Sequence, residues 1–316
     1  MDVLKGDLLK TINQIPRTIF SEDHDLFRQS MEDFVKAEVM PHHAQWEKEK
    51  MVSKDFWLSM GANGFLAPEI PEQYGGMGLD DFRFNAIISE VLNRAGCTGP
   101  GIGVPVHSDI VVPYIITYGT EAIKSEWLPK MASGEAIGAI GMSEPAAGSD
   151  LQGIKSTAVD KGDHYLVNGS KTFITNGYIA DAFVVAVKTD PEAGARGISL
   201  IFMDSSMEGF TKGFPFEKVG MHAQDTCELF FDNVKVPKEN LLGGEGEGFK
   251  YMMTKLPQER IIVAQGGLSA AEGALEATIG YIQEREAFGK PIAHMQTIRH
   301  KVAELATEVQ IGRVFM

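Results

Sequence analysis

The strongest constraint on the fold is a change of hydrophobic periodicity along the 316 residues. From Ser21 to about Thr120, apolar residues recur at the three- and four-residue spacings of helices. From roughly Ala136 to Val236, short β-branched and aromatic runs indicate strands, and beyond Gly248 the helical spacing returns. The sequence therefore predicts an α+β fold with an N-terminal α-helical domain over residues 1–135, a middle β-domain over 136–244 and a C-terminal α-helical domain over 245–316.

The clearest local signal in the β region is the dipeptide formed by Asn168 and Gly169. It follows the apolar run from Tyr165 to Val167 and precedes the run from Phe173 to Thr175. Because Asn-Gly tolerates the positive φ angles of a type I′ turn, this pattern predicts a tight hairpin. Thr175 is then expected on or near the end of a strand.

A long helix is expected after Gly248, because apolar residues keep a helical spacing from Phe249 to Ile282. Pro257 lies inside this pattern and has no N–H for the helical ladder, so we expect a kink beside Glu259. The glycine run from Gly243 to Gly248 partly mimics a dinucleotide-binding fingerprint. It does not follow the first strand of a βαβ unit, which favours a flexible connection over a phosphate site.

Composition sets further limits on function. The 29 basic and 43 acidic residues give a formal charge of −14, which argues against a broad nucleic-acid surface. No window has the apolar length of a bilayer span, and Asp2, Lys5 and Asp7 make the first residues unlike a secretory signal. Cys97 and Cys227 have no disulfide-framework or zinc spacing, and the eight histidines form no ligand motif. We expect a soluble globular protein of a reducing compartment, without a metal site.

Three motifs carry a specific resemblance to a known family. The segment Gly141-Met-Ser143-Glu144-Pro145-Ala-Ala-Gly148-Ser149-Asp150 closely resembles the flavin-binding signature of acyl-CoA dehydrogenases. Two more segments stand at the order and spacing of that family: Gly169-Ser-Lys171-Thr-Phe173-Ile-Thr175-Asn176-Gly177, and Arg285-Glu-Ala-Phe288-Gly289-Lys-Pro-Ile292 with Gln296. The resemblance spans essentially the whole chain. It implies a sandwich- or barrel-like middle domain and a helical bundle at the C-terminal end.

Shorter segments resemble the long-chain branch of the family: Cys97-Thr98-Gly99-Pro100, His107-Ser108-Asp109-Ile110 and Leu256-Pro257-Gln258-Glu259-Arg260. This resemblance implies a FAD-dependent enzyme of fatty acid β-oxidation, which converts an acyl-CoA thioester to the trans-2-enoyl-CoA. A carboxylate removes a proton from the α carbon while a β hydride passes to the flavin. The segment Leu256-Pro257-Gln258 favours medium to long straight acyl chains, and the expected electron acceptor is an electron-transferring flavoprotein.

The same resemblance assigns the catalytic base and the substrate contacts. Glu259 matches the position of the base in the long-chain and isovaleryl branches, although a glutamate beside an arginine is otherwise typical of a solvated helical turn. An apolar pocket would raise its pKa and make it a more effective base. Arg260 resembles a residue that contacts CoA, with an ion pair to Glu259 or another surface carboxylate as the alternative. Gln258, Arg196 and Ser149 are further candidates for substrate contact.

A set of residues is assigned to FAD in the same way. Ser143 is expected at the polar edge of the flavin ring and Thr175 at its N5. Phe173 is expected on the face of the ring, where many relatives carry tryptophan, so the stacking surface is kept but an indole donor is lost. Arg285 and Gln296 match positions that reach the FAD of a neighbouring subunit, which implies a homo-oligomer, either a tetramer or a dimer. The cofactor-binding residues expected are Ile140, Met142, Ser143, Ser149, Phe173, Ile174, Thr175, Arg285, Phe288 and Gln296.

The chain departs from the family at its C-terminal end. It stops at Met316 inside a helical pattern, whereas members of the family continue, so we expect an incomplete last domain. A catalytically silent scaffold is therefore one alternative. An acyl-CoA oxidase-like flavoenzyme is another, distinguished by rapid reaction of its reduced flavin with oxygen. The expected compartment is the bacterial cytoplasm or the mitochondrial matrix.

Overall fold

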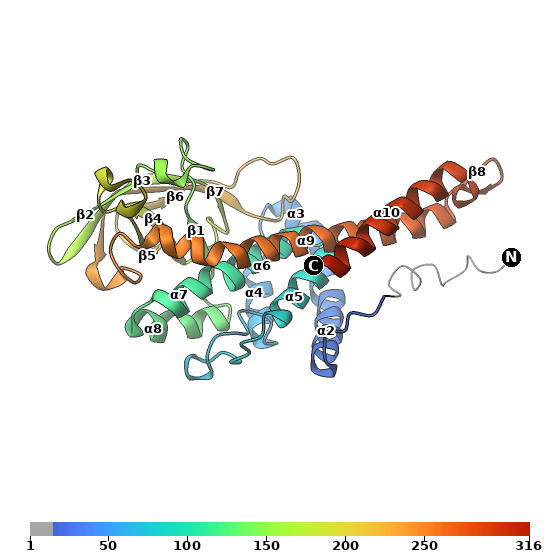
Figure 1. Ribbon diagram of the computed structural model, residues 1–316, viewed down its shortest axis with the longest axis horizontal. Helices are drawn as coiled ribbons and strands as arrows, with labels where there is room; N and C mark the ends of the chain where they lie inside the picture. Colours follow the sequence, from blue (N-terminus) through green and yellow to red (C-terminus); the bar gives the residue numbers. More distant parts are fainter. Residues whose placement is uncertain (1–14) are drawn as a thin grey trace.

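The computed structural model describes residues 15–316. Asp2, Lys5 and Asp7, on which the expected lack of a secretory signal rests, lie outside the described residues. Helices, strands and helices follow one another along the described chain, which confirms the predicted α+β class. Figure 1 shows the sheet at one end, shorter helices against it, and one long helix that extends past both. No helix in this part of the chain is long and apolar enough to cross a membrane.

The N-terminal helices start at polar caps. Side-chain oxygens of Ser53, Asp81 and Thr120 accept hydrogen bonds of 3.0–3.4 Å from amides in the first turn of α4, α5 and α8. The elements are α2 (Glu22–Phe34), the π-helix η1 (Val35–Val39), α3 (Met40–Glu49), α4 (Lys54–Ala62), the 3₁₀ turn η2 (Glu72–Tyr74), α5 (Phe82–Arg94), α6 (Thr98–Pro105), the π-helix η3 (Val106–Val111), α7 (Val112–Tyr118) and α8 (Glu121–Ala132).

The middle region forms one seven-stranded sheet in the order β1-β4-β2-β3-β7-β6, with β5 paired to β4. Every residue of β4 is buried, because successive side chains alternate between two apolar clusters. Phe183 and Val185 belong to one cluster, and Val184 belongs to the other. The strands are β1 (Gly138–Gly141), β2 (Thr157–Asp160), β3 (His164–Thr175), β4 (Ala182–Lys188), β5 (Ile198–Asp204), β6 (Phe210–Lys212) and β7 (Thr226–Pro237).

The hairpin predicted at Asn168 and Gly169 is wrong. Strand β3 runs through both residues, pairing with β2 and with β7. Gly169 has a φ of 143° and lies at a register break against β7, and a Cβ there would lie 2.3 Å from the Oγ of Ser156. The glycine therefore serves a bulge that passes close to a neighbouring side chain. The prediction for Thr175 is confirmed, since this residue ends β3.

The helix α9 (Gly248–Glu284) carries the chain from the sheet to the far tip of the molecule and continues through Pro257. A short hairpin of β8 (Glu286–Ala287) and β9 (Lys290–Pro291) reverses the chain at this tip. The last helix, α10 (Gln296–Phe315), returns beside α9, as Figure 1 shows. The predicted long helix is therefore confirmed.

The glycine run before α9 is held by hydrogen bonds. The amide of Gly244 donates to the Tyr251 hydroxyl at 3.0 Å, and the amide of Gly246 donates to Ser199 Oγ at 2.9 Å. A Cβ at Gly248 would lie 2.7 Å from the backbone carbon of Ser199, so the run passes tightly over β5. Hydrogen bonds thus hold the segment from Gly243 to Gly248 in place, whereas the sequence favoured a flexible connection.

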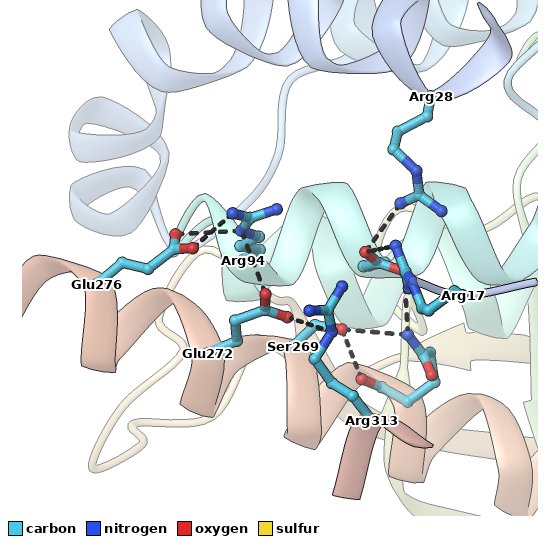
Figure 2. Close-up of polar contacts among 9 residues, drawn as sticks. Arg17, Arg28, Arg94, Ser269, Glu272, Glu276 and Arg313 are labelled. Atoms are coloured by element: carbon cyan, nitrogen blue, oxygen red, sulfur yellow. Dashed lines mark hydrogen bonds and ion pairs between the residues drawn. The ribbon is translucent and has the colours of Figure 1, made fainter. Parts of the chain in front are cut away.

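Buried charges join α9 to the N-terminal helices and to α10. Figure 2 shows this network, in which Glu90 of α5 and Glu272 of α9 each face two arginines. Both glutamate side chains are 2% exposed, so their charges depend on these partners in place of water. The pairs are Arg17–Glu90 (2.6 Å), Arg28–Glu90 (2.8 Å), Arg94–Glu276 (2.5 Å), Arg94–Glu272 (3.9 Å) and Arg313–Glu272 (3.4 Å).

Candidate active site

A cavity of about 250 Å³ opens where the first and third strands meet η3. Its walls are largely apolar, and the hydroxyl-bearing residues Ser143 and Thr175 supply its polar groups. A flat aromatic heterocycle with a polar edge suits such walls. The lining residues are Val106, Ile140, Met142, Ser143, Gly148, Leu151, Phe173, Ile174 and Thr175, all of which except Val106, Gly148 and Leu151 are predicted from the sequence.

Phe173 has an unusual backbone at the edge of this cavity. Its φ is 58°, in the left-handed region that side chains rarely adopt, and β3 breaks its register with β7 between Lys171 and Ile174. The side chain is 71% exposed, while Ile174 beside it is buried. Among residues 15–316, its one aromatic neighbour is the ring of Phe216, with centroids 5.6 Å apart. A strained residue that leaves a large ring uncovered is typical of a ligand-contacting position.

The end of β3 is fixed by Asn176, the residue after Thr175. Its side-chain amide donates to the carbonyl of Gly103 at 2.8 Å and to that of Gly138 at 3.2 Å. Its backbone amide donates to the carbonyl of Asp225 at 3.0 Å. These bonds join β3 to α6, β1 and the segment before β7, and so hold Thr175 at the cavity.

A buried ion pair lies behind the loop that follows β1. The Lys171 ammonium donates to Glu144 Oε1 at 2.8 Å and to the carbonyl of Met142 at 3.1 Å. Glu144 also accepts hydrogen bonds from the amides of Lys155 and Ser156 at 2.6 and 3.0 Å. Burial lowers the pKa of Lys171 to about 8, against the opposing effect of the Glu144 charge. The pair fixes the backbone that presents Met142 to the cavity.

Glu259, the predicted base, lies on α9 and is 8% exposed. Its Oε1 accepts a hydrogen bond of 2.9 Å from the hydroxyl of Tyr114 on α7. Burial raises the pKa of Glu259, while the hydrogen bond from Tyr114 and the charge of Lys255 act in the opposite direction. The carboxyl is therefore a stronger base than an exposed glutamate.

The helix η3 connects this carboxyl to the cavity. Val106 at the start of η3 lines the cavity, and the carbonyl of Asp109 in η3 accepts a hydrogen bond of 3.2 Å from Gln258. Gln258 immediately precedes Glu259, so one short helix borders both the cavity and the turn that bears the carboxylate. At η3, the cavity-lining segments of the middle region therefore come close to the turn of α9 that carries Gln258.

A second cavity of about 550 Å³ adjoins the Gln258 turn. Pro113, Ile116 and Leu79 give it an apolar wall, and its polar and charged lining includes Glu69, Glu72, Asp80, Asp81, Asn85 and Lys255. The Asn85 amide donates to Glu69 at 3.1 Å and to Asp109 at 2.5 Å. Burial raises the pKa of Glu69 to about 7 and also raises the pKa of Asp109.

The remaining predicted contacts lie in exposed positions. Arg260 is exposed on the turn of Glu259, and Ser149 is exposed beside the cavity-lining Gly148. Arg196 is exposed in the 3₁₀ turn η5 (Pro191–Gly197), and its backbone carbonyl oxygen would lie 2.5 Å from a Cβ at Gly246. All three side chains are open to solvent.

Arg285, Phe288 and Gln296 are not brought to the cavity of their own chain. All three are exposed at the tip where α9 turns into α10, far from the sheet (Figure 1). Phe288 is 95% exposed, and its φ of 55° places it in the turn between β8 and β9.

Besides the lining residues Val106, Gly148 and Leu151, the supporting residues Lys171, Glu144 and Tyr114 were not predicted as parts of the site. Lys171 and Glu144 belong to the motifs recognised in the sequence, but spacing gives no sign that they meet each other. Tyr114 belongs to an apolar helical pattern and reads as core packing, which its complete burial matches. The polar function of its hydroxyl follows only from the contact with Glu259. Among residues 15–316, no cluster of histidine, cysteine and carboxylate side chains is suited to hold a metal ion.

Comparisons with known proteins cover nearly the whole chain. Family models of acyl-CoA dehydrogenases match in three parts: the N-terminal domain over residues 21–135, the middle domain over 139–234 and the C-terminal domain over 246–316. The chain is 47% identical over 302 residues to the mitochondrial long-chain specific acyl-CoA dehydrogenase of Sus scrofa, covering 95% of this chain and 70% of that protein.

Solved structures give the same result. An acyl-CoA dehydrogenase from Geobacillus kaustophilus is similar with a TM-score of 0.92 and 49% identity, over 95% of this chain and 79% of that chain. An acyl-CoA dehydrogenase from Bacillus anthracis, complexed with FAD, is similar with a TM-score of 0.86 and 33% identity, over 94% of this chain and 51% of that chain.

Proposed function

The chain belongs to the acyl-CoA dehydrogenase family, and we propose that it carries out the FAD-dependent α,β-dehydrogenation of an acyl-CoA thioester to the trans-2-enoyl-CoA. The observation that carries this proposal is the position of η3, which borders both the largely apolar 250 Å³ cavity and the turn of the buried Glu259. Removal of a proton and a hydride from adjacent carbons requires a base and a hydride acceptor on opposite sides of one substrate.

The cavity beside η3 is the proposed site of the flavin ring. Ile140 and Met142 would pack on the ring, and the exposed face of Phe173 would cover its outer side. The hydroxyls of Ser143 and Thr175 would hydrogen-bond its polar atoms. FAD bound there supplies the acceptor for the hydride from the β carbon. The chain's own residues orient the ring and exclude water from it.

Glu259 is the proposed base. Its burial disfavours the ionised form, which makes the carboxylate a better proton acceptor for the α carbon of a thioester. The hydrogen bond from Tyr114 and the charge of Lys255, on the preceding turn, lower the pKa of Glu259 against the effect of burial. Gln258, Arg260, Ser149 and Arg196 are proposed contacts of the CoA portion.

The preferred substrates are proposed to be medium to long straight acyl chains. The 550 Å³ cavity beside Gln258, with its wall of Pro113 and Ile116, offers room for an apolar tail. We further propose that electrons pass to an electron-transferring flavoprotein. Arg285 and Gln296, exposed at the tip of α9, would reach the FAD of a second chain in a homo-oligomer. The proposed compartment is the bacterial cytoplasm or the mitochondrial matrix.

An anaerobic titration of the purified protein with acyl-CoAs of increasing chain length tests this function. After reconstitution with FAD, the wild-type protein is expected to lose flavin absorbance with medium and long chains. E259Q is expected to bind the same amount of flavin and to keep its absorbance. E284Q is a matched control, because Glu284 is exposed at the other end of the same helix. Bleaching by E259Q would exclude this base, and failure of the wild-type protein to take up FAD would leave the scaffold alternative.

A further inference from the structure

Tyr114 and Glu259 form a contact that the proposed function does not yet use. They come from α7 and α9 and are separated by 145 positions in the sequence. The Tyr114 side chain is completely buried, and its hydroxyl donates to Glu259 Oε1 at 2.9 Å. No other side chain among residues 15–316 donates a hydrogen bond to this carboxylate. Within the described part of the chain, the geometry gives Oε2 no hydrogen-bond donor.

The hydroxyl of Tyr114 has little freedom to move. Its ring lies 6.2 Å from that of Tyr118, which stacks on Tyr251 at 3.9 Å with an interplanar angle of 19°. The Tyr251 hydroxyl accepts the amide of Gly244, which precedes α9. Tyr114 is therefore held against α9 at two places: its hydroxyl bonds Glu259, and its ring neighbour Tyr118 stacks on Tyr251 of the same helix. A ring packed in this way cannot turn its hydroxyl aside without repacking its neighbours.

Other charged groups near Glu259 act more weakly or face elsewhere. Lys255, on the same helix, donates to Thr117 at 2.8 Å and shares its charge between Glu69 and Glu259. Asp109 of η3 meets the α9 turn through its backbone carbonyl, and its carboxyl faces Asn85. Tyr114 is thus the group that contacts the carboxylate of Glu259 directly.

We propose that Tyr114 is a positioning residue for the reaction, which holds Oε1 of Glu259 and leaves Oε2 to take the α proton of the substrate. The assignment of the α proton to Oε2 rests on the proposed function. The hydrogen bond between Tyr114 and Glu259 is independent of it. A donor on one oxygen fixes the plane of the carboxylate and stabilises its ionised form. The hydrogen bond thereby opposes the rise that burial gives to the pKa of Glu259.

The first test measures the titration of Glu259 without flavin or substrate. The purified full chain is labelled with δ-¹³C-glutamate, and the Glu259 signal is assigned as the one that E259Q loses. In Y114F, which keeps the ring, the pKa of Glu259 is expected to rise by about one unit or more, because the ionised form loses a charge-assisted hydrogen bond. In Y118F, whose hydroxyl does not touch the carboxylate, it should stay at the wild-type value. Equal values in Y114F and wild type would overturn the proposal.

The second test follows the rate of anaerobic flavin bleaching by an acyl-CoA as a function of pH. Y114F should bind FAD as the wild type does and should move the acidic midpoint upward by the shift found by NMR. At one pH unit below the wild-type midpoint the loss should be about tenfold. An equal loss at all pH values would show that Tyr114 is only a packing residue. If E259Q still bleaches, the proposed base is wrong, and the NMR result alone then decides the contact.

Discussion

Lys171 lies beneath the cavity loop with its ammonium 2.8 Å from Glu144, and its side chain has no exposure to solvent. The pair connects β3 to the segment that carries Met142 and Ser143, since the same ammonium also binds the Met142 carbonyl. A buried ion pair of this kind adds little to stability as a whole, but the loss of one partner leaves the other charge buried and unpaired.

Removal of this cation is therefore expected to be costly. K171M should lower the free energy of unfolding by about 3 kcal/mol, measured by urea denaturation. The double variant K171M/E144Q should recover part of that loss, because it removes the unpaired charge. K161M, at an exposed lysine, should change it by less than about 0.5 kcal/mol. A K171M protein as stable as K161M would contradict a structural role for the pair.

Substitution of Phe173 is expected to weaken FAD binding without lowering the stability of the fold. The Phe173 ring is 71% exposed, so F173A should leave the urea midpoint almost unchanged. Loss of the face that covers the flavin should weaken FAD binding about tenfold, measured by titration of the flavin-free protein. F214A is the matched control, because Phe214 is also exposed but does not line the cavity. Equal FAD affinity in the two variants would exclude Phe173 from the flavin site.

The buried network of Figure 2 predicts an unequal response to two similar substitutions. R94M removes the partner of Glu276 and one of the two arginines that face the buried Glu272, so it should cost about 2–3 kcal/mol of unfolding free energy. K301M breaks an ion pair with Glu304 whose side chains are 63% and 57% exposed, and should cost less than about 0.5 kcal/mol. Urea denaturation of both variants measures the difference, and similar losses would contradict it.

The raised pKa of Glu69 predicts a pH dependence of stability. Burial moves this pKa from 4.5 to about 7, against the opposing hydrogen bond from Asn85. Between those values the folded protein keeps a proton that the unfolded chain has lost, so this group's contribution falls as pH rises, by about 3 kcal/mol in all. E69Q removes the titration, so its stability relative to wild type should increase from about pH 5 to pH 8. For E72Q, at an exposed glutamate, the free energy of unfolding should change with pH in parallel with that of wild type. If the curve of E69Q is also parallel to that of wild type, the raised pKa of Glu69 is contradicted.

Local periodicity predicted the helices, the strands and the long α9, because each depends on residues a few positions apart. The Asn168–Gly169 turn was predicted wrongly, because pairing with β7 on one side and β2 on the other outweighs the local preference for a turn. Motif recognition identified most of the cavity lining, since those residues lie in two short segments. The Tyr114–Glu259 and Lys171–Glu144 contacts could not be predicted, because they depend on how distant elements pack.

The continuity of α9 has a consequence for changes in its length. The same helix places Glu259 beside Tyr114 and, further along, Glu276 beside Arg94. One inserted residue between them would rotate the later side chains by about 100° relative to the earlier ones and shift them by about 1.5 Å. Both contacts could not then form at once. Residue types between Glu259 and Glu276 can therefore be exchanged, but the number of residues between these two positions is fixed.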